Sequence, residues 1–205
     1  MNYALKIINL VIVSIIVIIV AGCASTKDSW FHGDYPNFKP GPEGGADLIE
    51  IKAGVDHTKY KFIFMDPVSF HYESSTEYSA IPPEVRKDLR KAFHSAIAEA
   101  LGNAYPIVDR PRPDALRVRV VITGMVPAIL AADPSHPPVS VGGSSMKAEI
   151  LDSFTNERVG AVIDRKKGNI QKAVGNMDEW AHTREVFKYW AHRLRNWLDK
   201  THKRK

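Results

Sequence analysis

Short apolar stretches in the middle of the chain predict β-strands. Residues 61–68 form an apolar run, and Pro67 limits how far it can continue as a central strand. Residues 116–123 alternate between apolar and polar side chains, as expected of a strand with one buried face. A further short strand is predicted at residues 105–109. The middle of the chain therefore predicts three strands.

A β-hairpin is predicted further along the chain. Residues 146–154 and 159–164 are apolar stretches separated by a turn at residues 155–157. Asn156 suits this turn because its short polar side chain tolerates a positive φ angle. The proline- and glycine-rich residues 127–143 predict a long loop before the hairpin.

Two segments repeat apolar residues at the helical spacing. The first opens at Ile81-Pro82-Pro83 and ends at Gly102, because proline suits the first helical turn and glycine the left-handed stop position. The second is expected to begin at Asn176, which with Glu179 matches a capping box. We expect its aromatic face to pack on the sheet, with docking to a membrane or partner as the alternative. This face contains Trp180, Phe187, Trp190 and Trp197.

The N-terminus has the three parts of a secretory signal peptide. Lys6 supplies a positive charge, residues 7–20 form an apolar run, and the small residues Ala21-Gly22 precede Cys23. The run is shorter than the roughly 20 apolar residues needed to cross a bilayer. Polar and charged residues follow from Ser25. A permanent membrane span is therefore the weaker interpretation.

Cys23 is the single cysteine of the chain, so it has no partner for an internal disulfide. Val20-Ala21-Gly22-Cys23 resembles the lipobox of bacterial lipoproteins. The resemblance implies cleavage between Gly22 and Cys23, a thioether-linked diacylglycerol on the cysteine and acylation of its new amine. Several acyl chains make a stable anchor where one is marginal. An ordinary secreted protein with an incidental cysteine is the alternative.

The residues after Cys23 bear on the choice of membrane. An aspartate directly after the acylated cysteine tends to retain Gram-negative lipoproteins in the inner membrane, and Ala24 occupies that position here. The resemblance therefore implies the outer membrane, with the protein facing the periplasm. The formal net charge of +5 is mildly basic, which favours anionic membrane or envelope surfaces. Nucleic acid is not expected as a partner of an exported protein.

The order of strand, helix, several strands and helix predicts an α+β fold. We expect a mixed, mainly antiparallel sheet of about four to five strands covered by two helices. The length of 205 residues fits one domain and a tether. Four segments are expected: a cleaved signal peptide (1–22), a lipid-anchored Pro/Gly-rich tether and lead-in (23–58), a single domain (59–201) and a basic tail (202–205).

Short motifs occur in order along almost the whole chain after the signal segment. They are Asp34-Tyr35, Lys39-Pro40-Gly41-Pro42-Glu43-Gly44-Gly45-Ala46-Asp47, Lys59-Tyr60-Lys61, Asp66-Pro67-Val68, Leu116-Arg117-Val118-Arg119, Val141-Gly142-Gly143-Ser144, Asp152-Ser153-Phe154-Thr155-Asn156-Glu157-Arg158, Asp164-Arg165-Lys166-Lys167-Gly168 and Tyr189-Trp190-Ala191 with Leu194. The set resembles the bacterial lipoproteins grouped as domain-of-unknown-function family 3313. Asn156 stands where the family pattern leads us to expect glycine. The resemblance implies a location and an architecture but no reaction, because the family has no established activity.

The sequence shows no pattern typical of a catalytic or metal-binding site. Gly142-Gly143-Ser144-Ser145 lacks the glycine that follows a serine by two residues in a nucleophile elbow. No phosphate-binding Gly-Lys-Ser or Gly-Lys-Thr motif occurs. His182 and His192 are separated by about 15 Å along the last predicted helix, too far to bind one ion. We therefore expect no enzyme activity, no cofactor and no metal.

Two acidic residues end apolar strands and form the best candidate site. Asp66 lies near the end of the first strand and Asp164 ends the second strand of the hairpin, while Arg117 and Arg119 lie on the alternating strand. A structural ion pair is the main interpretation of these four residues, and a ligand-binding pocket is the alternative.

These features together predict an outer-membrane lipoprotein that faces the periplasm. We expect a non-enzymatic binding or scaffolding module of the cell envelope, held to the membrane by its lipid and bound to an envelope protein. A subunit of an envelope assembly or export complex is one alternative. A periplasmic hydrolase is another, and it would need clustered acids, serine or histidine that the linear sequence does not display.

Overall fold

The computed structural model describes residues 37–71, 81–129, 131–133, 135–136, 138–168 and 178–204. The chain divides into two units, Met1–Pro36 and Asn37–Lys205, and every described residue belongs to the second. The predicted signal peptide, the cleavage site at Gly22 and Cys23, and the predicted helix cap at Asn176 lie outside the described residues. Among the described helices, none is both long and apolar enough to cross a bilayer.

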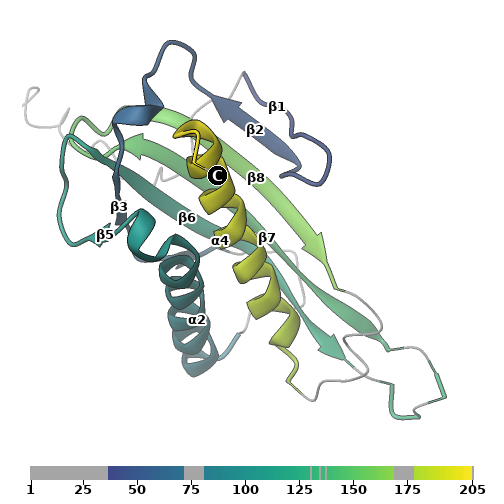
Figure 1. The fold of residues 1–205 in the computed structure, drawn as a ribbon. Helices are drawn as coiled ribbons and strands as arrows, with labels where there is room; N and C mark the ends of the chain where they lie inside the picture. The colour runs from purple at the N-terminus through teal and green to yellow at the C-terminus, as the bar shows by residue number, and fades with distance from the viewer. Residues whose placement is uncertain are drawn as a thin grey trace, which may run out of the picture. The chain divides into compact units, whose positions relative to one another are not determined.

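One mixed sheet of eight strands forms a layer beneath two long helices (Figure 1). Its strands run in the order β1-β2-β8-β7-β6-β3-β5, and β4 also pairs with β6. The pairs that involve β3, β4 or β5 are parallel, and all the others are antiparallel. The strands are β1 (Lys39–Pro40), β2 (Leu48–Ile51), β3 (Phe62–Met65), β4 (Ser69–Phe70), β5 (Ile107–Val108), β6 (Ala115–Ile129), β7 (Ser140–Asp152) and β8 (Arg158–Lys167).

The α+β architecture is confirmed, but the predicted number of about four to five strands was wrong. β5 lies within the strand predicted at residues 105–109. The additional strands β1, β2 and β4 are two to four residues long, which is too short to display an alternating pattern. β1 and β2 also lie within the segment predicted as a tether and lead-in. β2 joins the sheet through an antiparallel ladder with β8, in which Leu48 pairs with Ile163. The globular unit therefore begins at Asn37 rather than at Lys59.

β6 and β7 pair as one antiparallel ladder and reach beyond the predicted strands at residues 116–123 and 146–154. Their pairing extends to Ile129 and Ser140, inside the segment predicted as a loop. A register shift between Ile122 and Gly124 marks a bulge, after which the ladder resumes. At the other end of β7 the turn to β8 follows the prediction, with Asn156 at φ 59°.

The two helices pack on one face of the sheet (Figure 1). α2 (Pro83–Leu101) begins and ends where the sequence predicted, and Gly102 ends it with a φ angle of 50°. α4 (Ala181–Thr201) begins later than predicted, after a turn in which the Asp178 side chain accepts a hydrogen bond from the Trp180 amide. Two 3-10 turns, η1 (His57–Lys59) and η2 (Gly102–Ala104), join the remaining elements.

The hydrophobic core lies between the helices and the sheet. The side chains of Leu116, Val118, Val120 and Ile122 alternate along β6 and belong to this core, so Arg117 and Arg119 lie on the opposite face of the sheet. Phe93 of α2 meets Phe187 of α4 edge to face, with ring centroids 5.1 Å apart. Trp180, Phe187 and Trp190 are all buried, which places the aromatic face of α4 in the core.

Candidate functional site

The predicted acidic and basic residues form an ion-pair cluster around Asp66 on the face of the sheet away from the helices. Asp66 is 6% exposed and accepts hydrogen bonds from Arg117 Nε at 2.9 Å and Arg119 Nε at 3.1 Å. Arg117 Nη1 also donates to the Asn156 side chain at 2.7 Å, and Arg119 Nη1 contacts Glu149 at 3.2 Å. β3 runs parallel to β6, which places Asp66 beside both arginines.

We expect the ion-pair cluster around Asp66 to stabilise the folded protein, and mutation can test this. Asp66→Ala would leave two half-buried guanidinium groups without their shared acceptor, so we expect a loss of about 2–3 kcal/mol in the free energy of unfolding. Asp114→Ala is the matched control, because Asp114 forms a similar two-bond pair with Arg112 at a more exposed position and should cost about 0–1 kcal/mol. Urea denaturation measures both. An envelope phenotype without a loss of stability would instead favour the ligand-binding alternative.

Asp164 lies apart from this cluster, because its carboxylate binds a residue of the helix layer. It is 1% exposed and accepts a hydrogen bond from Trp190 Nε1 of α4 at 2.7 Å. It also accepts the Asp47 amide at 3.1 Å, and Lys166 Nζ lies 3.6 Å away. Asp164 therefore joins β8, α4 and the segment before β2.

Residues 41–47, which we call the 41–47 loop, dock on α4 and β8. The carbonyl of Gly44 accepts hydrogen bonds from the Tyr189 hydroxyl at 2.8 Å and from Arg193 Nη1 at 3.1 Å. The amide of Arg165 donates to the Asp47 carboxylate at 3.0 Å. A Cβ atom at Gly45 would lie 2.6 Å from the carbonyl oxygen of Pro42 and 2.8 Å from Arg193, so the close approach requires glycine.

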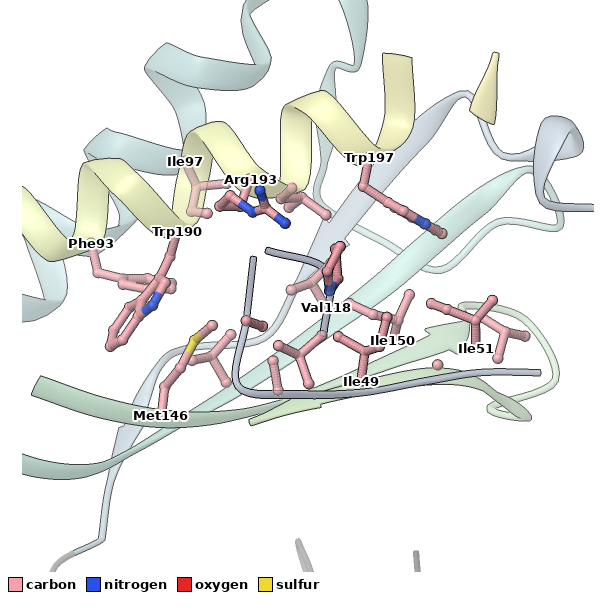
Figure 2. A pocket seen from close by; sticks show the side chains of 18 residues that line it. Ile49, Ile51, Phe93, Ile97, Val118, Met146, Ile150, Trp190, Arg193 and Trp197 are labelled. Atoms are coloured by element: carbon pink, nitrogen blue, oxygen red, sulfur yellow. The ribbon is translucent and has the colours of Figure 1, made fainter. Parts of the chain in front are cut away.

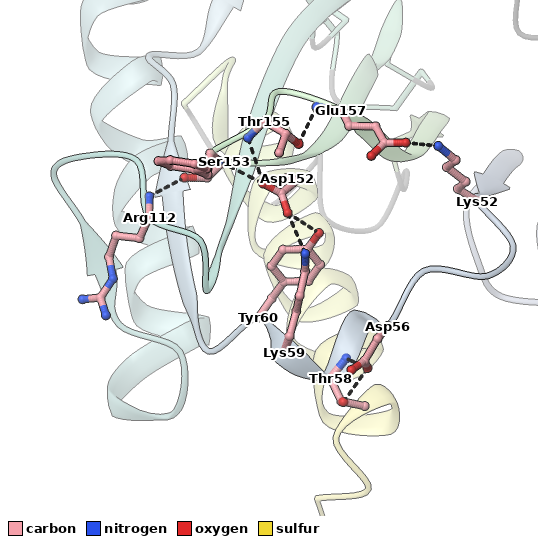
Figure 3. A network of polar contacts seen from close by, with 11 residues as sticks. Lys52, Asp56, Thr58, Lys59, Tyr60, Arg112, Asp152, Ser153, Thr155 and Glu157 are labelled. Carbon is pink, nitrogen blue, oxygen red and sulfur yellow. Dashed lines mark hydrogen bonds and ion pairs between the residues drawn. The ribbon is translucent and has the colours of Figure 1, made fainter.

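A third polar cluster surrounds Asp152 at the end of β7 (Figure 3). Its Oδ2 atom accepts hydrogen bonds from Lys59 Nζ at 2.8 Å and from the Tyr60 hydroxyl at 2.9 Å. Its Oδ1 atom accepts the amides of Phe154 and Thr155, each at 3.0 Å. Asp152 was not among the candidate site residues predicted from the sequence. An aspartate directly before a turn was the available signal, because its side chain can accept the amides two and three residues ahead.

The ionisation of this cluster suits a structural role. Burial by itself raises the pKa of Asp152. Hydrogen bonds from Lys59, Tyr60 and two backbone amides together lower this pKa by more than burial raises it, so the pKa lies well below 3.8. Burial and the hydrogen bond to Asp152 raise the pKa of Tyr60 to about 12. A general acid or base works best with a pKa near the operating pH. Neither residue meets that condition near neutral pH.

An apolar cavity of about 200 Å³ lies between α4 and the sheet. Figure 2 shows Trp190, Arg193 and Trp197 of α4 on one side, with Met146 and Ile150 of the sheet facing them. Of the described residues that line the cavity, Arg193 alone has a charged side chain, and Asp66, Ser144 and Asp164 are not among them. The cavity therefore offers contacts mainly to apolar groups.

Within the described part of the chain, no group of three or more His, Cys, Asp or Glu side chains is arranged to hold a metal ion.

A family model described as "Protein of unknown function (DUF3313)" matches residues 27–194. The chain belongs to the DUF3313 family. The match includes all eight strands, α2 and most of α4. A search of curated proteins finds no match to this DUF3313 protein.

Solved structures with a similar fold share little sequence with this DUF3313 protein. A PelC dodecamer from Paraburkholderia phytofirmans is 8% identical, with a TM-score of 0.40, and the alignment covers 77% of this chain and 97% of that chain. A neuraminyllactose-binding hemagglutinin homolog from Helicobacter pylori is 12% identical, with a TM-score of 0.40 and coverage of 82% and 94%. These similarities are too weak to transfer binding or assembly to this chain.

Several of the short motifs that the chain shares with the family contact one another in the fold. The Lys59-Tyr60 motif meets the Asp152 turn, and the Asp66 motif meets the arginines of β6. The 41–47 loop meets Asp164 and the Tyr189-Trp190 motif. The contacts of Asp164, the 41–47 loop and Tyr189-Trp190 link β8 to α4 beside the cavity, whereas the Asp66 cluster lies on the opposite face of the sheet.

Proposed function

We propose that this DUF3313 protein is an outer-membrane lipoprotein facing the periplasm. The observation that carries the proposal is the Val20-Ala21-Gly22-Cys23 motif at the end of a short apolar run, which contains the single cysteine of the chain. Ala24 in place of aspartate supports sorting to the outer membrane. Residues 24–36 would then link the lipid to the globular unit and span at most about 45 Å when fully extended.

We further propose that the globular unit is a non-enzymatic binding or scaffolding module of the cell envelope. Its buried carboxylates at Asp66, Asp152 and Asp164 accept hydrogen bonds from neighbouring side chains or amides, which supports a structural role for them. The cavity beneath α4 is lined almost wholly by apolar side chains, which supports binding rather than bond cleavage. Crosslinking in intact cells, followed by mass spectrometry, would identify an envelope protein partner.

Metabolic labelling with an alkyne fatty acid tests the anchor. We expect the wild-type protein to take up the label and to sediment with the outer membrane. Cys23→Ser removes the sulfur that forms the thioether and should reduce labelling to background. Ser25→Ala is the matched control and should keep full labelling. A wild-type chain without label would refute the lipid anchor, and labelled protein in the inner membrane would refute the proposed sorting.

A further inference from the structure

The lining of the cavity beneath α4 extends over four strands of the sheet and about two turns of α4. Four neighbouring strands contribute to its lining, from β2 through β8 and β7 to β6, which corresponds to a width of about 14 Å across the sheet. The lining on α4 extends from Trp190 to Trp197, about 10 Å along the helix axis. Its volume of about 200 Å³ exceeds the roughly 150 Å³ of an apolar cavity that is known to admit benzene. The space therefore suits a slender apolar group.

The volume of the cavity distinguishes between kinds of occupant. A protein helix with its side chains is roughly 10–12 Å in diameter, which is too wide for a space of about 200 Å³ between α4 and the sheet. A single alkyl chain is thin enough to lie along α4 over the apolar side chains of the sheet. Trp190 and Trp197 would contact such a chain at the two ends of the α4 lining (Figure 2).

A positive charge lies on the lining of the cavity. Arg193 lines it from α4 and donates Nη1 to the Gly44 carbonyl at 3.1 Å. A carbonyl is a neutral acceptor, so this bond does not cancel the charge, and a guanidinium has further N–H donors. Lys166 donates to the neighbouring Gly45 carbonyl at 3.3 Å, but its Nζ also lies 3.6 Å from the Asp164 carboxylate, so the attraction of an anionic group depends on Arg193. An anionic group would be attracted to this position.

The 41–47 loop and β2 form one side of the cavity. Pro42 and Ala46 of the loop and Ile51 of β2 belong to its lining, and Ile51 is 44% exposed. The loop contacts α4 through the hydrogen bonds that the Gly44 carbonyl accepts from Tyr189 and Arg193. An anionic group could replace the Gly44 carbonyl as the partner of Arg193 while its alkyl chain enters beneath α4.

We propose that this cavity binds one alkyl chain of an anionic amphiphile, with the anionic group at Arg193. The inference goes beyond the proposed function, because the cavity belongs to residues 37–205 and does not depend on acylation of Cys23. A fatty acid and an anionic phospholipid share the required chemistry.

Photoaffinity labelling of the full chain in isolated membranes tests this proposal. The probes are a diazirine-bearing palmitic acid, its methyl ester, and a phosphatidylglycerol with the same acyl chain. We expect crosslinks on the peptides that contain α4 residues 190–197 and β7 residues 146–150, mapped by mass spectrometry. Stronger labelling by the free acid identifies a fatty acid as the source, and stronger labelling by the phosphatidylglycerol identifies a phospholipid.

Two variants that fill the cavity test whether the labelling depends on the cavity being open. Ala148→Trp and Ile49→Trp each place a bulky ring in the lining and should reduce cavity labelling at least about tenfold. Their thermal unfolding shows whether each variant is folded, and the folded variant provides the result. Labelling that is absent from the wild type, or unchanged in a folded filled variant, would overturn the proposal.

A charge variant tests the role of Arg193. Arg193→Gln should reduce labelling by the free acid about fivefold while leaving the methyl ester within about twofold. Lys188→Gln is the matched control, because it removes one positive charge from the exposed side of the same helix, and it should change neither. Equal losses of labelling by the acid and by the ester would refute the assignment of the anionic group to Arg193.

The experiment on Cys23 tests a different proposal. Absence of metabolic labelling at Cys23 would refute the lipid anchor alone, so the two proposals fail separately.

Discussion

Asp164→Ala is expected to lower the free energy of unfolding by about 3–5 kcal/mol. The carboxylate is 1% exposed and accepts hydrogen bonds from Trp190 Nε1 and the Asp47 amide. Its removal would leave the buried indole N–H without this acceptor and remove one of the hydrogen bonds that hold the 41–47 loop to β8. Urea denaturation followed by tryptophan fluorescence measures the loss, because Trp190 reports directly on the site.

Two further variants separate hydrogen bonding from packing at this position. Asp164→Asn keeps one oxygen acceptor and should cost less than Asp164→Ala. Trp190→Phe keeps an aromatic ring in the core but removes the N–H donor. In a double-mutant cycle we expect a coupling of about 1–3 kcal/mol between the two positions. Additive effects would show that the contact contributes little and that Asp164 acts through its other partners.

Asp152→Ala is expected to cost about 2–4 kcal/mol at neutral pH, because four donors lose a buried, charged acceptor. The folded pKa of Asp152 lies below its ordinary value of 3.8. Its contribution is therefore present above about pH 4 and is lost as the pH falls toward the folded pKa. The stability difference between the wild type and Asp152→Ala should shrink below pH 4, as measured by urea denaturation at several pH values.

Tyr60→Phe provides the control at alkaline pH. The folded pKa of Tyr60 is raised from 10.0 to about 12, so its stabilising contribution is present below pH 10 and is lost as the pH rises through 12. The stability difference between wild type and Tyr60→Phe should therefore shrink between pH 10 and 12. A constant difference over that range would contradict the hydrogen bond between the Tyr60 hydroxyl and Asp152.

Local sequence patterns were sufficient where the structure depends on neighbouring residues. The start of α2 at Pro83 and its end at Gly102 follow from the backbone preferences of proline and glycine. The alternation of residues 116–123 predicted most of β6, and Asn156 predicted the turn after β7. Each of these features is encoded within a few consecutive residues.

The candidate site was only partly predictable. Asp66, Arg117 and Arg119 were chosen because they lie at the end of one strand and along another, and the parallel pairing of β3 with β6 brings them together. Asp164 was chosen for the same reason, because it lies at the end of a predicted strand. It faces α4 instead, because the register of β8 directs its side chain toward the helix layer.

The sequence by itself determined the α+β class, the boundaries of α2 and the hairpin of β7 and β8, because periodicity and turn chemistry are local properties. It also contains the Cys23 motif from which we infer the anchor. Only the tertiary structure decided that Leu48–Ile51 belongs to the sheet, that Tyr60 meets Asp152, and that an apolar cavity lies beneath α4. These features depend on residues far apart in the chain, and their positions follow from strand order and register rather than from any local pattern.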